Sequence, residues 1–175
     1  LLARFEEADI SLPGGCAIGL RPINFHLEAL KKMGASIEIE AGHVKARAKG
    51  GLKGAHIVFD KISVGATENI LIAATLAKGT TVIENAALEP EVMALVDMLI
   101  SMGAKIKQEG RQFTIDGVER LSGSKITVIP DRIEAGSYAL AALITDGEVE
   151  LQGINGGVFS SIEKALIQVG ADLTD

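Results

Sequence analysis

A repeat with a period of about seventy residues restricts the fold of this chain more than any other feature. Gly-Ala steps begin at Gly34, Gly103 and Gly170, at spacings of 69 and 67 residues. Each step follows a stretch with the spacing of an amphipathic helix and precedes an alternating, strand-like stretch. Because glycine readily adopts the left-handed conformation that ends a helix, we expect these glycines to be helix C-caps.

Further matching segments show that the repeated unit is longer than one helix and one strand. Residues 60–65 resemble residues 131–136, 71 positions later, and residues 73–79 resemble residues 141–147. Helices with one apolar face must cover a sheet, so several units are expected to pack around a shared interior, unless the copies pack as separate domains. We place the boundary between parts at Pro130-Asp131, where a new copy begins.

The middle copy has the clearest element pattern, predicted as helix, strand, helix, strand, strand, strand. Its second helix is expected to bury a face of Val92, Leu95, Val96, Leu99 and Ile100, which are spaced by three and four residues. A shorter helix is predicted over residues 27–33. In order, the predicted elements of the middle copy are residues 66–77, 80–84, 90–102, 105–109, 112–116 and a strand near 125–130.

Composition excludes several classes of function. The chain has 175 residues, 47% hydrophobic and 23% charged, which is typical of a soluble globular protein. Its net charge of −6 argues against nucleic-acid binding, which depends on clustered Lys and Arg. The apolar run 70–76 is far shorter than the ~20 residues that span a bilayer, so no membrane segment is expected.

The single cysteine and the three histidines argue against disulfide and metal chemistry. One cysteine cannot form an internal disulfide, which favours a reducing, cytoplasmic location. His26, His43 and His56 share no metal-ligand spacing with Cys16 or with one another, so we expect no structural zinc and no cofactor.

Cys16 lies at the centre of the most unusual segment, residues 11–22, which read SLPGGCAIGLRP. Pro13 and the glycines around Cys16 predict a loop in which the thiol is accessible. Arg21 nearby would favour the thiolate, the reactive form of cysteine. The alternative is a buried and inert cysteine, which is the commoner fate of a free thiol.

Two further segments each lead into a predicted helix and could hold an anionic group at the helix start. In the first, residues 21–25, the alternative is an ordinary helix start with Asn24 as the cap and His26 on the surface. In the second, residues 61–64, the order of a phosphate-binding Walker loop is missing, so the pattern alone is weak. Glu89 and Glu91 flank Pro90 at another helix start, where the helix dipole favours carboxylates whatever their function.

Taken together, these residues resemble the UDP-N-acetylglucosamine enolpyruvyl transferase family over essentially the whole chain. The segment Leu12–Gly19, followed by Arg21-Pro22, is similar to the family's catalytic loop, whose cysteine separates it from the shikimate-pathway relatives. Further matches occur in order at residues 52–57, 61–67, 84–87, 89–91 and 130–134.

The resemblance implies transfer of the enolpyruvyl group of phosphoenolpyruvate to the 3-hydroxyl of UDP-N-acetylglucosamine. Cys16 would be the general acid and the residue that the antibiotic fosfomycin alkylates. Asn24 stands where the family usually has an acidic residue. The residues that would bind the sugar nucleotide are Arg21, Pro22, Ile23, Asn24 and Phe25, together with Lys61, Ile62, Ser63 and Val64.

The same resemblance implies an α/β fold, an inside-out barrel whose two halves are each built from βαβαββ units. Residues 1–130 would belong to the half that carries the cysteine loop, and residues 131–175 would start the second half. Several of the family's phosphoenolpyruvate-binding and catalytic residues have no counterpart here, so this piece alone is not expected to catalyse. The alternatives are a non-catalytic nucleotide-sugar-binding or scaffold module and, last, a cysteine hydrolase, for which no base is evident.

Overall fold

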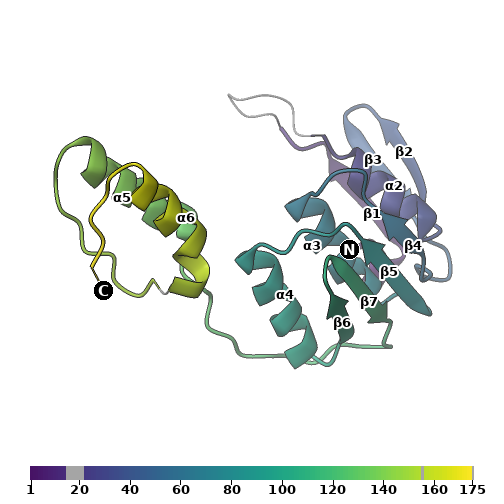
Figure 1. Cartoon of the computed structure of the whole chain (residues 1–175). Coiled ribbons are helices and arrows are strands. Elements are labelled where there is room, and N and C mark those ends of the chain that lie inside the picture. Colours follow the sequence, from purple (N-terminus) through teal and green to yellow (C-terminus); the bar gives the residue numbers. More distant parts are fainter. Residues whose placement is uncertain (15–21, 155, 175) are drawn as a thin grey trace. The chain divides into compact units, whose positions relative to one another are not determined.

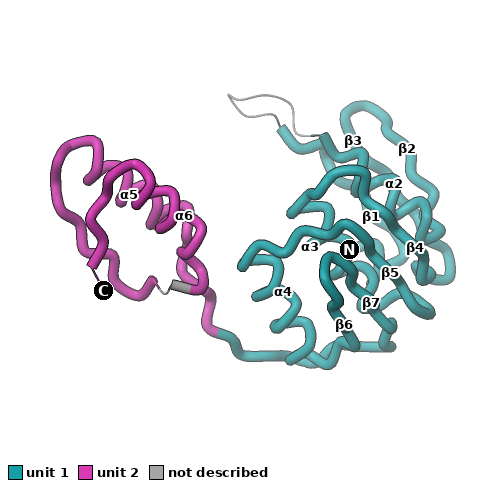
Figure 2. Tube along the Cα trace, in the orientation of Figure 1, with its two compact units in different colours: residues 1–126 teal, residues 127–175 magenta. Residues whose placement is uncertain are grey.

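The computed structural model describes residues 1–14, 22–154 and 156–174. The chain divides into two compact units, residues 1–126 and residues 127–175 (Figure 2). The boundary predicted at Pro130-Asp131 lies just inside the second unit. That the two units belong to different halves of a longer fold stays a prediction.

Unit 1 combines helices with two sheets among its described residues (Figure 1). One sheet is three-stranded and antiparallel, in the order β1-β3-β2, and the other is four-stranded, in the order β4-β5-β7-β6. The elements are α1 (Leu2–Phe5), β1 (Glu7–Ser11), α2 (Asn24–Lys32), β2 (Ser36–Glu40), β3 (His43–Arg47), β4 (His56–Val58), α3 (Val64–Ala74), β5 (Thr80–Glu84), α4 (Pro90–Ser101), β6 (Lys105–Glu109) and β7 (Gln112–Asp116).

The second half of unit 1 is one complete βαβαββ unit, which runs from β4 to β7. β4 pairs in parallel with β5 across the α3 connection, and β5 then pairs antiparallel with β7. β6 and β7 form a hairpin. The strands predicted at 80–84, 105–109 and 112–116 are confirmed at those bounds. The residue pattern of the middle copy therefore predicted these three strands at their observed bounds.

The strand predicted near 125–130 is wrong, because the described residues there form no strand. A strand is stable only when its backbone groups pair with a neighbouring strand. Here the segment joins the two units, and Val128 is 81% exposed. The helix predicted at 66–77 also differs: α3 begins at Val64 and ends at Ala74.

The three repeated glycines end their helices as predicted. Gly34, Gly103 and Gly170 have φ values of +93°, +101° and +97°. In each case the next amide donates back across the helix end, over 3.0, 2.9 and 3.0 Å respectively. This is the Schellman arrangement, which satisfies carbonyls that the helix leaves free.

The core of unit 1 lies between the four-stranded sheet and helices α3 and α4. α3 packs on β5 and β7, and α4 packs on β6. Val92, Val96 and Leu99 of α4 are buried as predicted, whereas Ile100 is 45% exposed and was wrongly assigned to the buried face. The sheet and α3 contribute the fully buried side chains of Ile57, Ile83, Phe113, Ile115, Ile70 and Leu71.

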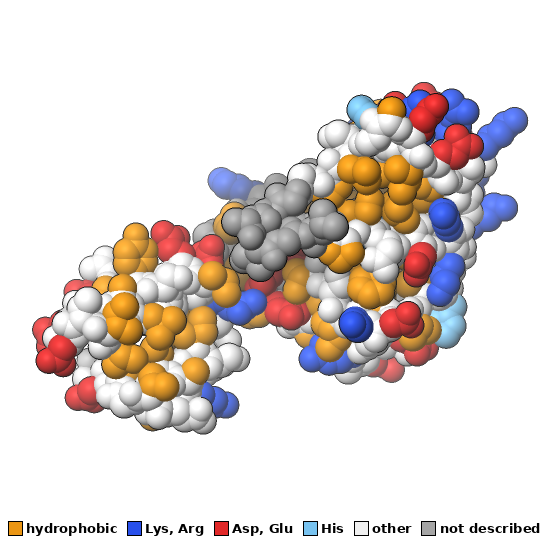
Figure 3. All heavy atoms as spheres, turned by 90° about the horizontal axis from the view of Figure 1, so that it is seen from above, with side chains coloured by type: hydrophobic (Ala, Val, Ile, Leu, Met, Phe, Trp, Pro, Cys, Tyr) orange, Lys and Arg blue, Asp and Glu red, His pale blue; other side chains and the backbone are white. Residues whose placement is uncertain are grey.

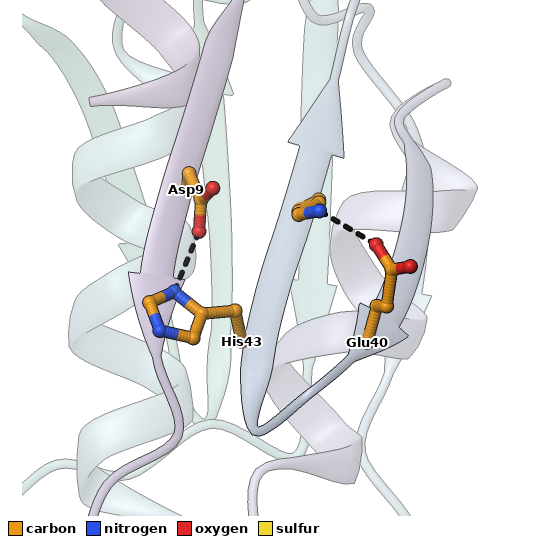
Figure 4. A network of polar contacts seen from close by, with 4 residues as sticks. Asp9, Glu40 and His43 are labelled. Carbon is orange, nitrogen blue, oxygen red and sulfur yellow. Dashed lines mark hydrogen bonds and ion pairs between the residues drawn. The ribbon is translucent and has the colours of Figure 1, made fainter.

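The three-stranded sheet presents a charged outer face (Figure 4). Its central strand, β3, places His43 and Lys45 between acidic residues of both neighbours. His43 Nδ1 lies 2.8 Å from Asp9 Oδ1, and Lys45 Nζ donates to Glu40 Oε2 over 2.6 Å. These pairs are solvated, so each contributes little to stability.

Unit 2 contains α5 (Arg132–Ile144) and α6 (Gly156–Gln168), which pack on each other. Asp131 caps α5, because its Oδ1 accepts from the amides of Ile133 and Glu134. Figure 3 shows hydrophobic side chains exposed together on this unit. The exposed large hydrophobic residues include Ile133, Tyr138, Leu140, Ile144, Ile167 and Val169. In the part of the chain that the structure describes, every helix is too short or too polar to cross a membrane.

Candidate functional site

The two predicted binding segments lie at the starts of α2 and α3. Pro22 and Ile23 precede α2, and Asn24 and Phe25 form its first residues. Lys61 and Ile62 are exposed just before α3, Ser63 is its N-cap, and Val64 is its first residue. The amides of a helix start carry a partial positive charge, so both segments present a favourable surface for an anionic group.

The start of α3 is fixed by its own cap. Ser63 has an extended backbone, and its Oγ accepts from the amide of Ala66 over 3.3 Å. The cap leaves the Ser63 hydroxyl proton available to donate. The exposed Lys61 adds a cation beside the same turn. This combination suits a phosphate or a carbonyl-bearing ring.

The start of α2 differs from the expected helix start. Ile23 is the N-cap and has no polar side chain, while Asn24 lies one position inside the helix and is exposed. The alternative in which Asn24 caps the helix is therefore wrong. Because no side chain among the described residues caps α2, its first amides are available to another acceptor.

Three contacts join the first turn of α2 to residues on either side of segment 61–64 in unit 1. The ring of Phe25 meets that of Phe59 edge-on, with centroids 6.2 Å apart and an interplanar angle of 62°. The side-chain amide Nδ2 of Asn69 lies 3.0 Å from Nδ1 of His26. His26 also lies against Gly65, where an added Cβ would stand 3.7 Å from the ring carbon Cε1. The starts of α2 and α3 thus lie side by side and together form the candidate binding surface.

His26 is half-buried between α2 and α3, so its expected place on the surface is wrong. An amide nitrogen can only donate, so His26 Nδ1 accepts from Asn69 and the neutral ring carries its proton on Nε2. Burial lowers the pKa of His26 below its ordinary value. The imidazole is therefore held neutral near physiological pH.

A small depression lies between α2 and β4, next to this surface. Phe25 and Phe59 form part of its apolar lining, and charged side chains flank it at Glu28, Lys32 and Asp60. The remaining lining residues are Ala29, Ile57 and Val58. Its lining includes Phe25 of α2 and Asp60, which precedes Lys61 in the chain, so the depression adjoins both helix starts.

A second polar group is a cluster of carboxylates where α3 meets the start of α4; the sequence pointed to Glu89 and Glu91 but not to Glu68. Burial raises the pKa of Glu68, and repulsion from Glu91 and then Glu89 raises it further. Glu89 Oε2 is buried and has no hydrogen-bond partner among the described residues. Among those residues no group of His, Cys, Asp and Glu has an arrangement that could hold a metal ion. Glu68 was missed because nothing in its local sequence indicates which helix it faces.

Cys16 and Arg21 lie outside the described residues, and their roles stay predictions. The structure describes both flanks of their segment. On one side, the amide of Leu12 donates to the carbonyl of Gly42 over 2.7 Å, which extends the β1–β3 edge. On the other side, Pro22 leads directly into α2. The predicted reactive cysteine is therefore joined by a short segment to the surface described above.

Comparison with known families agrees with this fold. The profile of EPSP synthase (3-phosphoshikimate 1-carboxyvinyltransferase) matches residues 1–175, the full sequence. The chain belongs to this family. The mixed α/β fold class predicted from the resemblance to enolpyruvyl transferases is thereby confirmed.

Curated relatives of the chain include UDP-N-acetylglucosamine 1-carboxyvinyltransferases from several bacteria. The chain is 53% identical to that of Paramagnetospirillum magneticum over 176 residues, which cover 100% of this chain and 41% of the relative. It is 55% identical to that of Shewanella sediminis, over 99% of this chain and 42% of the relative. The chain thus spans about two fifths of the length of these relatives.

Solved structures of enolpyruvyl transferases have the same fold at lower identity. EPSP synthase from Acinetobacter baumannii matches with a TM-score of 0.69 and 27% identity, covering 96% of this chain and 38% of that one. The enolpyruvyl transferase NikO from Streptomyces tendae matches with a TM-score of 0.69 and 25% identity, covering 81% and 34%. Sequence identity is thus about twice as high to the UDP-N-acetylglucosamine transferases as to these structures.

Proposed function

We propose that the protein carrying this chain transfers the enolpyruvyl group of phosphoenolpyruvate to the 3-hydroxyl of UDP-N-acetylglucosamine. The observation that supports this proposal is a sequence identity of 53–55%, over essentially the whole chain, to curated enzymes named for that reaction. This reaction would place the protein in peptidoglycan synthesis and in the cytoplasm. The substrates are small molecules, and neither a nucleic acid nor a cofactor takes part.

In this proposal Cys16 is the general acid. Its thiol gives a proton to the methylene carbon of phosphoenolpyruvate while the sugar 3-hydroxyl adds to the neighbouring carbon and passes its own proton to a base elsewhere in the parent chain. The resulting tetrahedral intermediate then loses inorganic phosphate and a methyl proton, which restores the double bond. A thiol can also add covalently to phosphoenolpyruvate, and the same nucleophile would open the epoxide of fosfomycin.

The surface at the starts of α2 and α3 would bind the sugar nucleotide. Ser63 keeps a hydroxyl proton to donate, Lys61 supplies a cation, and the first amides of α2 would donate to an acceptor on the ligand. Arg21 would lie between this surface and Cys16 along the chain. Asn24 replaces the acidic residue usual in the family, so it would accept a hydrogen bond from the ligand without a full negative charge.

The rest of the parent chain would complete the active site, because residues 1–175 cover about two fifths of the relatives. Residues 1–130 would belong to the half with the cysteine loop, and residues 131–175 would begin the other half. We therefore expect catalysis from the full-length protein and none from residues 1–175 alone.

The test measures phosphate release by the full-length protein from phosphoenolpyruvate and UDP-N-acetylglucosamine, with Cys16→Ser alongside. We expect turnover that requires both substrates and is lost in Cys16→Ser. Intact mass after fosfomycin treatment should show one adduct on the wild type, formed faster with the sugar nucleotide present, and none on Cys16→Ser.

Other outcomes would identify the alternatives. Binding of UDP-N-acetylglucosamine without turnover or fosfomycin labelling would favour a nucleotide-sugar-binding module. Labelling of Cys16 by iodoacetamide without any affinity for the sugar nucleotide would favour unrelated cysteine chemistry. Either result would reject the transferase proposal.

A further inference from the structure

The first turn of α2 contacts both sides of the 61–64 segment. Phe25 packs edge-on against Phe59, which precedes that segment in the chain. The next residue, His26, accepts from Asn69 and lies against Gly65, both of which follow the segment. The two residues therefore hold the turn before α3 from either end.

We propose that His26 is a positioning residue, which sets the sugar-nucleotide-binding segment of α3 against that of α2 through its hydrogen bond to Asn69. This inference rests on the proposed function. It assigns to His26 no contact with the substrate and no proton transfer.

The chemistry of the contact supports a positioning role. A hydrogen bond is directional, so the Asn69–His26 bond of 3.0 Å limits how α3 can rotate about its axis relative to α2. An apolar contact such as Phe25–Phe59 permits sliding. The rotation of α3 determines where Lys61, Ser63 and the amide of Val64 face, so the polar pair controls the geometry of the binding surface.

The packing of α3 indicates that the pair is not needed for folding. α3 is already anchored in the core, because Ala66, Ile70 and Leu71 are fully buried. The His26–Asn69 pair is only part-buried and lies on the side of α3 that faces α2. Its loss should therefore leave the helix in place and loosen its orientation.

The experiment uses the full-length protein with His26→Leu, Asn69→Leu and the double variant, and measures UDP-N-acetylglucosamine affinity by calorimetry. Each single change should raise Kd roughly tenfold, and the double variant should be little worse than either, because both remove one bond. In turnover, the loss should fall on KM for the sugar nucleotide rather than on kcat. His26→Gln, whose amide oxygen can still accept from Asn69, should recover most of the affinity.

His56→Leu is the matched control, because His56 also pairs with a side chain on another element, Glu84, at 2.6 Å. It should bind like the wild type. If His26→Leu and Asn69→Leu lower thermal stability but bind with wild-type Kd, His26 is structural and the inference is wrong. If His26→Leu does not fold, the Kd values of Asn69→Leu and His26→Gln decide whether His26 is a positioning residue. Failure of the wild type itself to bind would instead reject the proposed function, on which the inference depends.

Discussion

Gly117 packs so closely on Ala77 that a Cβ at residue 117 would stand 1.6 Å from the Ala77 carbonyl oxygen. The amide of Gly117 also donates to the carbonyl of Gly79 over 3.0 Å. Gly54 approaches the same stretch of chain, since its Cβ would lie 2.2 Å from the carbonyl oxygen of Thr80. The backbone at residues 77–80 thus lies between two glycines that leave no room for a side chain.

We predict that Gly117→Ala destabilises the chain by about 3 kcal/mol or more, because backbone atoms must move to admit the methyl group. Urea unfolding measures the change. Gly123→Ala is the control: no atom lies within 4 Å of its added Cβ, so its effect should stay within about 0.5 kcal/mol. Similar values for the two variants would contradict the close approach at Ala77.

The sequence marks Gly117 as special without revealing why. Asp116-Gly117 has the sequence of a turn. If Gly117 were needed only for that turn, other residues could replace it at a modest cost in stability. The actual requirement comes from Ala77 and Gly79, about forty residues earlier in the chain. Local pattern identifies where the chain bends, whereas the neighbour across the bend depends on tertiary packing.

Acid should weaken the fold through His26. Burial lowers the pKa of His26 in the folded state, so the folded protein binds this proton less readily than the unfolded chain. The stability from a neutral His26 is complete above the unfolded value, about 6.5, and is lost as the pH falls through it. We predict that urea unfolding shows this decline in the wild type and a smaller one in His26→Gln, whose side chain does not titrate. Equal declines would exclude His26 as the cause.

Glu68 should change the stability of the fold with pH in the opposite direction to His26. Burial and the neighbouring Glu91 and Glu89 raise its pKa, so the folded state holds this proton more tightly than the unfolded chain. The stability that protonated Glu68 contributes is complete at low pH. It is lost as the pH rises above the ordinary glutamate pKa of about 4.3. We predict that Glu68→Gln raises stability at neutral pH by less than about 1 kcal/mol, because solvent screens this partly exposed group.

Thermal unfolding of Glu68→Gln at pH 7 and at pH 4 tests this prediction. The gain should shrink at the lower pH, where the wild-type carboxyl is already protonated to a larger extent. Asp97→Asn, on α4 but outside the carboxylate cluster, is a suitable control and should show no comparable gain. A loss of stability in Glu68→Gln would show that the charged form makes a favourable contact.

Sequence periodicity predicted the scaffold better than it predicted the site. Strands 80–84, 105–109 and 112–116 follow from alternation and from glycines at helix ends, which are local properties. The His26–Asn69 and Glu68–Glu91 relationships join residues on different helices, and no local pattern encodes them. The prediction of a strand near residues 125–130 was wrong for the same reason. A strand needs a neighbouring strand to pair with, and the local sequence does not show whether that neighbour is present.

The two units should differ strongly in stability, which hydrogen exchange can measure on residues 1–175. In unit 1, β5 and β7 lie at the centre of a sheet, and Ile83, Phe113 and Ile115 are fully buried. In the described part of unit 2, Phe159 and Leu166 are the buried hydrophobic residues, and α5 and α6 are 13 residues each. Isolated helices of that length are marginal in water, so packing must supply their stability.

We therefore predict that amides of β5 and β7 exchange at least about a hundredfold more slowly than those of α5 and α6, since exchange follows the local opening free energy. In the full-length protein, α5 and α6 should gain protection, because further chain would cover side chains such as Ile144, which is 81% exposed here. Equal protection of the two units within residues 1–175 would mean that two helices suffice for a stable core. Unchanged protection in the full-length protein would mean that the exposed face of unit 2 is not where the remaining chain packs.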